Sequence, residues 1–245
     1  MKRIIAVIAV LMLLFAAGCS GGAKDIDIVS STETPESGSE WTSGAEKNTR
    51  VSIVGSVAYL FDGGKTLYGA VEYKNTSDCA IVLSSASFDF RIDGQETFKT
   101  FIPVLAEYDV VMPGETSYVI YWEKFDEPKP SNAKVELHPA LSCEKAKTQR
   151  INIALSDAMA AENYPGFATL SGVIENTGGE RCSLNMIYAA FYDEYGSLLG
   201  VWNFTENAAL DVGARRSFVS NMTELEIDRL AERAAVIKGA GFGFN

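Results

Sequence analysis

The sequence contains few of the residues from which catalytic and metal-binding sites are usually built. It has one histidine, His138, and four cysteines among 245 residues. Transition metals are held by clusters of His, Cys, Asp or Glu, and no such cluster with metal-ligand spacing is visible. The motifs GxSxG, GxGxxG and GxxxxGKS/T, which mark hydrolases and nucleotide sites, do not occur. The sequence therefore predicts no catalytic residue, no metal and no cofactor.

The remaining polar candidates have ordinary structural interpretations. His138 precedes a proline in a predicted strand and is interpreted as a structural side chain. A nucleophilic pair of Cys143 with His138 would need contact, but residues five apart lie on opposite faces of a regular strand. The acidic turn at Asp193 and Glu194 does not supply the about six to eight oxygens that calcium takes.

Basic residues are scarce as well. The chain has 21 Lys and Arg against 32 Asp and Glu, which gives a net charge of −11. Nucleic-acid binding depends on Lys and Arg that neutralise phosphates, so no nucleic-acid partner is expected. Hydrophobic residues make up 47% of the chain, which is enough for a packed globular core.

The N-terminus has the organisation of a signal peptide. Lys2 and Arg3 precede an uncharged apolar run from Ile4 to Phe15. This run is shorter than the about 20 residues of a membrane-spanning helix, and its length and flanks are typical of an exported protein's signal segment.

The next residues resemble the bacterial lipobox, the processing signal of lipoproteins. Ala16, Ala17 and Gly18 precede Cys19, and Ala16 stands where the lipobox usually has leucine. The resemblance implies a signal peptide over residues 1–18 and a diacylglyceryl group on the Cys19 sulfur. Two or three acyl chains anchor a protein stably, whereas one anchors it only marginally. The alternative is ordinary secretion with cleavage at nearby small residues.

Residues 19–48 are predicted to form a flexible tether. They are rich in Ser, Gly, Thr and Glu and have little hydrophobic periodicity, so they cannot bury enough apolar area to offset the entropy of ordering. A coil of about 29 residues has a reach of roughly 30 Å, which would hold a folded domain clear of lipid head groups.

Residues 49–145 show the pattern of short β-strands separated by turns. The alternation is clearest from Ala86 to Ile92, where apolar and charged residues occupy opposite faces. A weaker strand is expected at Tyr108 to Val111. About seven strands without a crossover helix indicate an antiparallel sandwich.

Residues 146–245 repeat this organisation and are predicted to form a second β-sandwich domain. Asp157 to Asn163 is expected to be a loop or one helical turn, and Thr223 to Ala231 a short capped helix. The fold class predicted is therefore all-β, with two tandem immunoglobulin-like antiparallel sandwiches after the signal peptide and tether.

Each half has an apolar strand, an Asn-Thr turn, a cysteine, and a long strand that ends in a polar turn. Cys79 precedes Phe88 by nine positions and Cys182 precedes Phe191 by nine, so the two cysteines are predicted to be equivalent. A disulfide between them would require their Cα atoms to lie within about 7 Å. The favoured interpretation is that Cys79, Cys143 and Cys182 are all reduced, small, buried side chains.

The second repeat resembles the FxLYD domain of bacterial surface lipoproteins over about residues 167–222. The first aromatic of the family name falls on Ala189 and its leucine on Phe191. The family is immunoglobulin-like in fold, is often tethered by lipid and has no assigned catalytic residues, so the resemblance implies fold and location but no site. The matching features are Gly172, Asn176-Thr177, Phe191-Tyr192-Asp193, Gly196 and Val212-Gly213.

Two stretches are candidate binding surfaces. The strand that holds Tyr118, Tyr121 and Trp122 carries aromatics on both faces, and these residues are candidates for contact with a sugar ring or a partner; the alternative is that neighbouring elements cover both faces. The last strand, residues 235–244, has glycine at every second position from Gly239 to Gly243. Its glycine side would receive a partner strand at a sheet edge, or lie under a bulky neighbour in the interior.

The predicted function is a non-catalytic binding or scaffolding role for a lipoprotein that Cys19 anchors to the extracytoplasmic face of a bacterial cell membrane. The expected partner is an envelope protein or a polysaccharide. The first alternative is an adhesion or wall-associated module whose domains act as spacers. The second is an envelope enzyme, which would need a pocket that holds several titratable groups.

Overall fold

The computed structural model describes residues 50–245, with gaps at residues 95, 105–108, 131, 165–166, 223–224, 226 and 228, and without the side chains of residues 96, 163, 164 and 167. Residues 45–245 form one compact unit. The predicted signal peptide, Cys19 and the whole predicted tether lie outside the described residues. Within the described part, no helix is long and apolar enough to span a membrane.

The described chain consists mainly of strands, which fall into two sets of six. The first half contains β1 (Val51–Phe61), the single 3-10 turn η1 (Asp62–Gly64), β2 (Thr66–Asn75), β3 (Ile81–Ile92), β4 (Glu96–Ile102), β5 (Thr116–Lys124) and β6 (Val135–Lys145). The second half contains β7 (Ile151–Tyr164), β8 (Phe167–Asn176), β9 (Leu184–Tyr192), β10 (Leu198–Glu206), β11 (Arg215–Met222), α1 (Leu230–Arg233) and β12 (Val236–Phe244).

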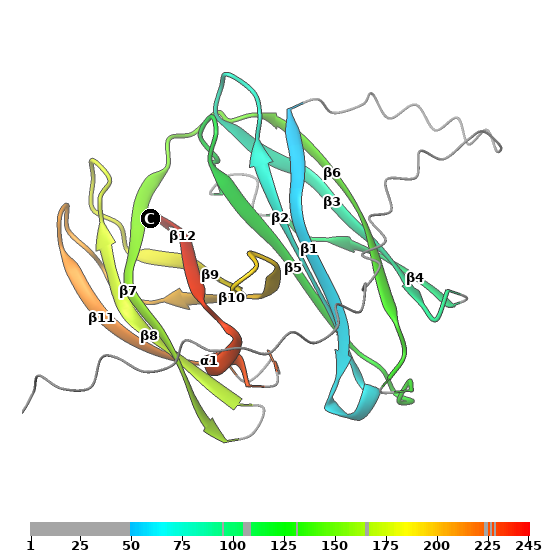
Figure 1. Cartoon of the computed structure of the whole chain (residues 1–245). Coiled ribbons are helices and arrows are strands. Elements are labelled where there is room, and N and C mark those ends of the chain that lie inside the picture. Colours follow the sequence, from blue (N-terminus) through cyan, green and yellow to red (C-terminus); the bar gives the residue numbers. More distant parts are fainter. Residues whose placement is uncertain are drawn as a thin grey trace, which may run out of the picture. The chain divides into compact units, whose positions relative to one another are not determined.

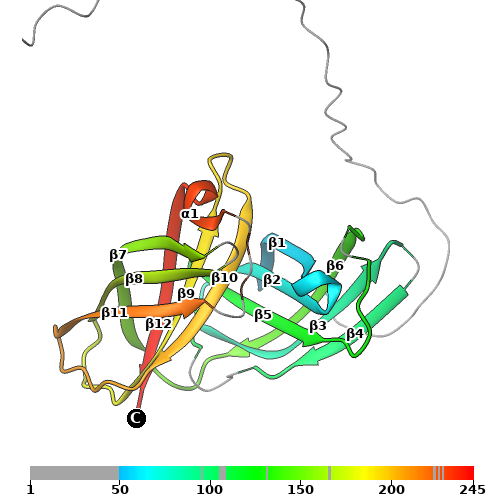
Figure 2. The same cartoon turned by 90° about the horizontal axis from the view of Figure 1, so that it is seen from below.

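The two halves have the same sheet topology. The first half has sheets of order β1-β2-β5 and β4-β3-β6, which form two layers in Figure 1. The corresponding sets in the second half are β7-β8-β11 and β10-β9-β12, shown from another side in Figure 2. Here β7 joins the two sets into one six-stranded sheet, because it pairs with β8 and, at its start, with β12. All of these pairings are antiparallel, and the predicted all-β, immunoglobulin-like class with two tandem sandwiches is confirmed.

The core of the first half comes from the strand alternation that the sequence shows. Successive side chains of a strand point to opposite faces, so Phe88 and Phe90 of β3 both face β2 and β5 and are fully buried. Their rings meet edge to face, with centroids 5.7 Å apart. Burial of each phenylalanine contributes about 1.5–3 kcal/mol. A Cβ on Gly69 would lie 2.6 Å from the Phe90 ring, so this close approach requires glycine.

A buried asparagine ends the second strand of each half. In the first half, Asn75 donates from Nδ2 to the carbonyl oxygens of Cys79, at 2.8 Å, and Val111, at 2.9 Å. Its Oδ1 accepts the main-chain N–H of Ser77 at 2.9 Å. Because these groups belong to two separate segments, the turn after β2 and the stretch before β5, one side chain fixes the corner of the sandwich.

Asn176 repeats these contacts in the second half. Its Nδ2 donates to the carbonyl oxygens of Glu180, at 2.8 Å, and Leu210, at 3.0 Å, while Oδ1 accepts the N–H of Gly178 at 2.9 Å. Both asparagines are 0% exposed. The Asn-Thr dipeptides that the sequence marks as turns are therefore the same buried corner, present twice.

This duplicated corner shows which residues of the halves correspond. Ile81 lies six residues after Asn75, and Cys182 lies six residues after Asn176; each forms an isolated bridge to the segment that follows the fourth strand of its half. Cys182 therefore corresponds to Ile81, and the predicted equivalence of Cys79 and Cys182 is wrong. The equal spacing to phenylalanine is coincidental, because Cys79 lies four residues after Asn75, where the second half has Glu180.

No disulfide joins Cys79, Cys143 and Cys182 in the described part of the chain, as the favoured interpretation predicted. The predicted burial holds only for Cys182, because Cys79 and Cys143 are partly exposed. Cys182 is fully buried in the second core, and Cys79 and Cys143 pack against the first.

Three local predictions are corrected. Residues 157–163, expected as a loop or helical turn, continue β7 after an irregularity at Asp157, whose φ is 52°. Of the helix expected from Thr223 to Ala231, the last two residues lie in α1, the described residues 225, 227 and 229 are not helical, and residues 223, 224, 226 and 228 lie outside the described residues. In the described part of the strand expected at 108–111, only Val111 forms a bridge. The first half therefore has six described strands rather than about seven.

The last strand, β12, is an interior strand. It pairs with β9 along its whole length and with β7 near its end. A Cβ on Gly243 would lie 2.6 Å from the Cβ of Cys182, and one on Gly241 would lie 3.0 Å from the Ile153 carbonyl oxygen. The glycines let neighbouring residues approach closely, so the interior alternative is correct.

A tyrosine of the first half forms hydrogen bonds with main-chain groups of an edge strand in the second half. The Tyr68 hydroxyl of β2 donates to the Val201 carbonyl oxygen at 2.7 Å and accepts the Val201 N–H at 2.8 Å. Because β10 is an edge strand, these main-chain groups would otherwise lack a neighbouring strand. Tyr68, Ala70 and Tyr118 also belong to the same apolar cluster as the second core.

Tyr68→Phe is expected to lower the free energy of unfolding by about 2 kcal/mol, because it leaves a buried N–H and a buried carbonyl of Val201 without this partner. Urea unfolding of the whole chain measures the change. Tyr195→Phe is the matched control, since Tyr195 is 85% exposed, and should change stability by less than about 0.5 kcal/mol. Equal effects of the two variants would show that the hydroxyl of Tyr68 does not hold the halves together.

Candidate functional site

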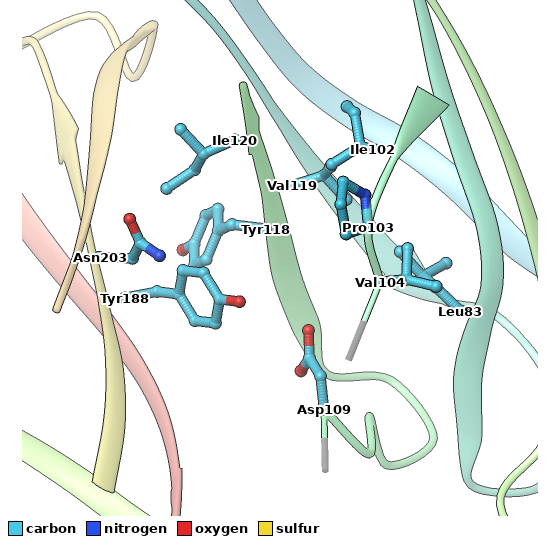
Figure 3. Close-up of a pocket in the computed structure, with 10 residues that line it drawn as sticks. All are labelled: Leu83, Ile102, Pro103, Val104, Asp109, Tyr118, Val119, Ile120, Tyr188 and Asn203. Carbon is cyan, nitrogen blue, oxygen red and sulfur yellow. The ribbon is translucent and has the colours of Figure 1, made fainter. Parts of the chain in front are cut away.

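A cavity of about 260 Å³ lies where the two halves meet. It surrounds part of β5, an edge strand of its sheet. Figure 3 shows the residues of β3 and β4 on one side of β5 and those of β9 and β10 on the other. Six of the lining residues are apolar: Leu83, Ile102, Pro103, Val104, Val119 and Ile120.

Four polar side chains share the cavity: Asp109, Tyr118, Tyr188 and Asn203. Asn203 of β10 and Tyr188 of β9 are directly paired, so their side chains lie on the same face. The ring centroids of Tyr118 and Tyr188 are 6.2 Å apart. Figure 3 shows the Asp109 carboxylate directed toward the space beside the Tyr188 ring. Each half of the chain therefore contributes polar groups to one space.

Asp109 is the charged group of the cavity. Burial raises the pKa of its carboxyl group from 3.8 to about 6, and the Ser117 hydroxyl is the largest influence in the opposite direction. Ser117 Oγ lies 3.0 Å and 3.2 Å from the two carboxylate oxygens and donates to them. The Tyr73 hydroxyl is a second hydrogen-bonding influence that lowers this pKa. A carboxylate has about four lone-pair positions, so two hydroxyl groups leave part of its accepting capacity unused.

The positive charge of Arg150 also lowers the pKa of Asp109. Its guanidinium is held by other groups. Nη1 donates to the Val110 carbonyl oxygen at 3.0 Å, and Nη2 forms an ion pair with Glu115 at 2.9 Å. Arg150 therefore acts on Asp109 through its field while its hydrogen bonds are directed elsewhere.

The raised pKa of Asp109 has a consequence for stability. Between about pH 3.8 and 6 the folded protein holds a proton that the unfolded chain has released. The free energy of unfolding therefore falls as the pH rises through this window. The difference between the two pKa values corresponds to about 3 kcal/mol. At neutral pH an ionised Asp109 is a net cost to the fold, as is common for functional groups.

The two tyrosines remain neutral near physiological pH. Burial, and then the negative charge of Asp109, raise the pKa of Tyr188, and burial raises the pKa of Tyr118. The Tyr118 hydroxyl lies 3.2 Å from that of Tyr192. The rings thus offer the cavity neutral aromatic surfaces, with polar hydroxyl groups at their edges.

The structure separates the three aromatic residues predicted as a binding surface. Tyr118 is 3% exposed and faces the second half. Tyr121 lies on the opposite face of β5 and packs against Phe90 and Phe98 in the first core. Trp122 is 44% exposed. Neighbouring elements therefore cover Tyr118 and Tyr121, as the alternative interpretation of the sequence predicted. Of the three aromatic residues, only Trp122 remains at the surface.

The other polar candidates have structural surroundings. His138 is exposed on β6, with Nε2 4.0 Å from Glu136, whereas Cys143 packs against the first core. Asp193 accepts the main-chain N–H groups of Tyr195 and Ser197 and so closes its own turn. Among the described residues, no group of three or more His, Cys, Asp or Glu is placed to hold a metal ion.

Sequence reasoning did not find Asp109, Tyr188 or Asn203. The available signal was a single acidic residue before Val110 and Val111, at the start of an apolar pair. A lone carboxylate beside an apolar run is a candidate buried charge. Tyr188 and Asn203 could not be found in the same way, because they lie on strands more than 70 positions further along the chain.

The fold and the cavity thus define an all-β protein of two tandem immunoglobulin-like sandwiches with a polar cavity between them. No protein-family model matches the chain, and no curated protein matches it. Among solved structures, a calcium-binding mutant of Bacteroides uniformis β-glucuronidase 2 is 12% identical, with a TM-score of 0.25. The match covers 77% of this chain and 28% of that structure. At this TM-score the likeness carries no argument about function.

Proposed function

We propose that the protein is a lipid-anchored lipoprotein of the bacterial cell envelope that binds a ligand, without catalysis, in the cavity between its two sandwiches. The observation that carries binding is the cavity itself, which receives an ionised carboxyl group and two aromatic rings from different halves. The proposed anchor at Cys19 and the tether of residues 19–48 rest on the sequence, and the resemblance to FxLYD lipoproteins supports the same location.

Binding is the better proposal because of the kind of groups that line the cavity. Small-molecule sites combine an apolar lining with a few polar groups that fix orientation, and this cavity has six apolar and four polar residues. Acid–base catalysis commonly uses a second titratable group tuned for the opposite role. Among the described lining residues Asp109 has the one carboxyl group, and both tyrosines have raised pKa values.

The alternative role as a spacer is supported by the junction between the halves. Tyr68 forms two buried hydrogen bonds to Val201, and the Tyr118 and Tyr192 hydroxyl groups meet at 3.2 Å. Such contacts couple the sandwiches mechanically, as a spacer requires. A spacer does not need a cavity that binds small molecules, so occupancy of the cavity separates the two functions.

Titration of the whole chain with small aromatic fragments, followed by NMR, tests the proposal. We expect chemical-shift changes to concentrate on Tyr118, Tyr188 and Asn203. Ile120→Trp should abolish them, because the larger ring fills the cavity that Ile120 lines. Val219→Trp is the matched control, since Val219 is 74% exposed on β11, and it should leave the changes intact. Shifts that are absent, or that persist in Ile120→Trp, would favour the spacer.

A further inference from the structure

The cavity is small, which limits the ligand to one ring or a short branched chain. An apolar cavity of about 150 Å³ accommodates benzene, and small-molecule sites usually begin at about 300 Å³. At about 260 Å³ this cavity holds a ring with a short side chain but not a disaccharide. Its apolar side chains, such as Ile120, favour an apolar ligand body.

The charge in the cavity determines the second part of the ligand. Asp109 receives hydrogen bonds from Ser117, while the guanidinium of Arg150 is directed to Val110 and Glu115. A cationic ligand group would donate to the remaining lone pairs of Asp109 in a charge-assisted hydrogen bond, which is about twice as strong as a neutral one. An anionic group would be repelled by the same carboxylate.

The aromatic rings that line the cavity also favour a positively charged ligand group. A cation within about 6 Å of a tyrosine ring is attracted to its face, and more strongly where water is excluded. Tyr118 and Tyr188 are 3% and 8% exposed, respectively, and both line the cavity with Asp109. The net charge of −11 also raises the local concentration of cations near the protein.

We infer that the cavity is a binding site for a small organic ammonium ion, with the apolar body against Ile120, on the side of β5 that faces Tyr118 and Tyr188, and the ammonium group on Asp109. This inference rests on the proposed function of the cavity as a binding site and specifies its ligand class. Tyr118 and Tyr188 face the cation, and Asn203 is the further polar group that orients the ligand.

Binding should be stronger above about pH 6 than below it, because Asp109 must be ionised. The groups that act on this carboxyl group are Ser117 on β5, Tyr73 on β2, Arg150 before β7 and Tyr188 on β9. Both tyrosines have pKa values raised by burial, so neither ionises in this range. Asp109 is therefore the group in this set that titrates between about pH 5 and 7.5.

The test compares phenethylammonium with its neutral near-isostere 2-phenylethanol by calorimetric titration of the whole chain in lipid nanodiscs. At about pH 7.5 we expect phenethylammonium to bind about tenfold or more tightly than the alcohol, and this preference to fall at about pH 5. Asp109→Asn should remove the preference, since it keeps the shape of the side chain and an oxygen for Ser117. Asp211→Asn is the matched control, because Asp211 is exposed at 82% and pairs with Arg181.

The outcomes separate the ligand class from the proposed function. Equal binding of both compounds, abolished by Ile120→Trp, would overturn the ammonium inference and leave a neutral binding cavity. Failure of both compounds to bind would overturn the ammonium inference. If the aromatic fragments also cause no chemical-shift changes in the NMR titration, the proposed binding function is overturned too. A loss of affinity in Asp109→Asn cannot be ascribed to unfolding, since removal of this buried charge should raise the melting temperature near pH 7.

Discussion

Asn176→Ala is expected to lower the free energy of unfolding by about 3–4 kcal/mol, because it removes three hydrogen bonds of a fully buried side chain at once. The carbonyl oxygens of Glu180 and Leu210 and the N–H of Gly178 would all lose their side-chain partner. A typical domain has a stability of about 5–15 kcal/mol, so this one change removes a large part of it. Urea unfolding, with a check that the m-value is unchanged, measures the effect.

Two further variants distinguish this corner from an ordinary buried side chain. Asn176→Asp should be at least as destabilising, because a carboxylate would face two carbonyl oxygens where the amide now donates. Asn221→Ala, on the exposed part of β11, should cost less than about 0.5 kcal/mol. If Asn176→Ala costs less than about 1 kcal/mol, water replaces the side chain and the corner does not stabilise the sandwich.

Cys19→Ala is expected to release nearly all of the protein from the membrane fraction. Each buried methylene of an acyl chain contributes about 0.8 kcal/mol to membrane binding, and the described chain contains no helix that could span the bilayer in its place. Metabolic labelling with a clickable palmitate analogue, followed by cell fractionation, measures both acylation and release.

The matched control is Cys79→Ala, which removes a free cysteine within the first sandwich and should keep both label and membrane location. Absence of label from the unsubstituted protein would show that Ala16 prevents lipobox processing and that the protein is secreted freely. Membrane retention of Cys19→Ala would show that another part of the chain provides the anchor.

Strand alternation made most of the fold predictable. The long strand that contains Phe88 and Phe90 has its apolar face in the core, as the sequence pattern requires. Predictions failed where the main chain departs from regular geometry. The expected loop after Asp157 is strand because β7 continues past an irregularity there. The equivalence assigned to Cys79 and Cys182 failed because it relied on the spacing to phenylalanine, whereas the buried asparagine of each half aligns Cys79 with Glu180.

The candidate site was not predictable by the same reasoning. The strand of Tyr118 has aromatics on both faces, so the sequence leaves open whether Tyr118 is exposed, and the structure shows that the second half covers it. Asp109 and Asn203 lie almost a hundred positions apart and share one cavity. No periodicity or motif relates such residues, because their proximity depends on how one sandwich packs against the outer face of the other.

The sequence by itself determined the all-β class, the tandem repeat and the places of most strands, because these follow from local alternation and turn residues. It also carries the whole basis for the expected lipid anchor at Cys19. Only the tertiary structure decided that Asn75 and Asn176 are buried corners, that β12 is interior, and that Asp109 meets Tyr188. Each of these depends on contacts between distant segments, which form only when the sheets pack and exclude water from the groups between them.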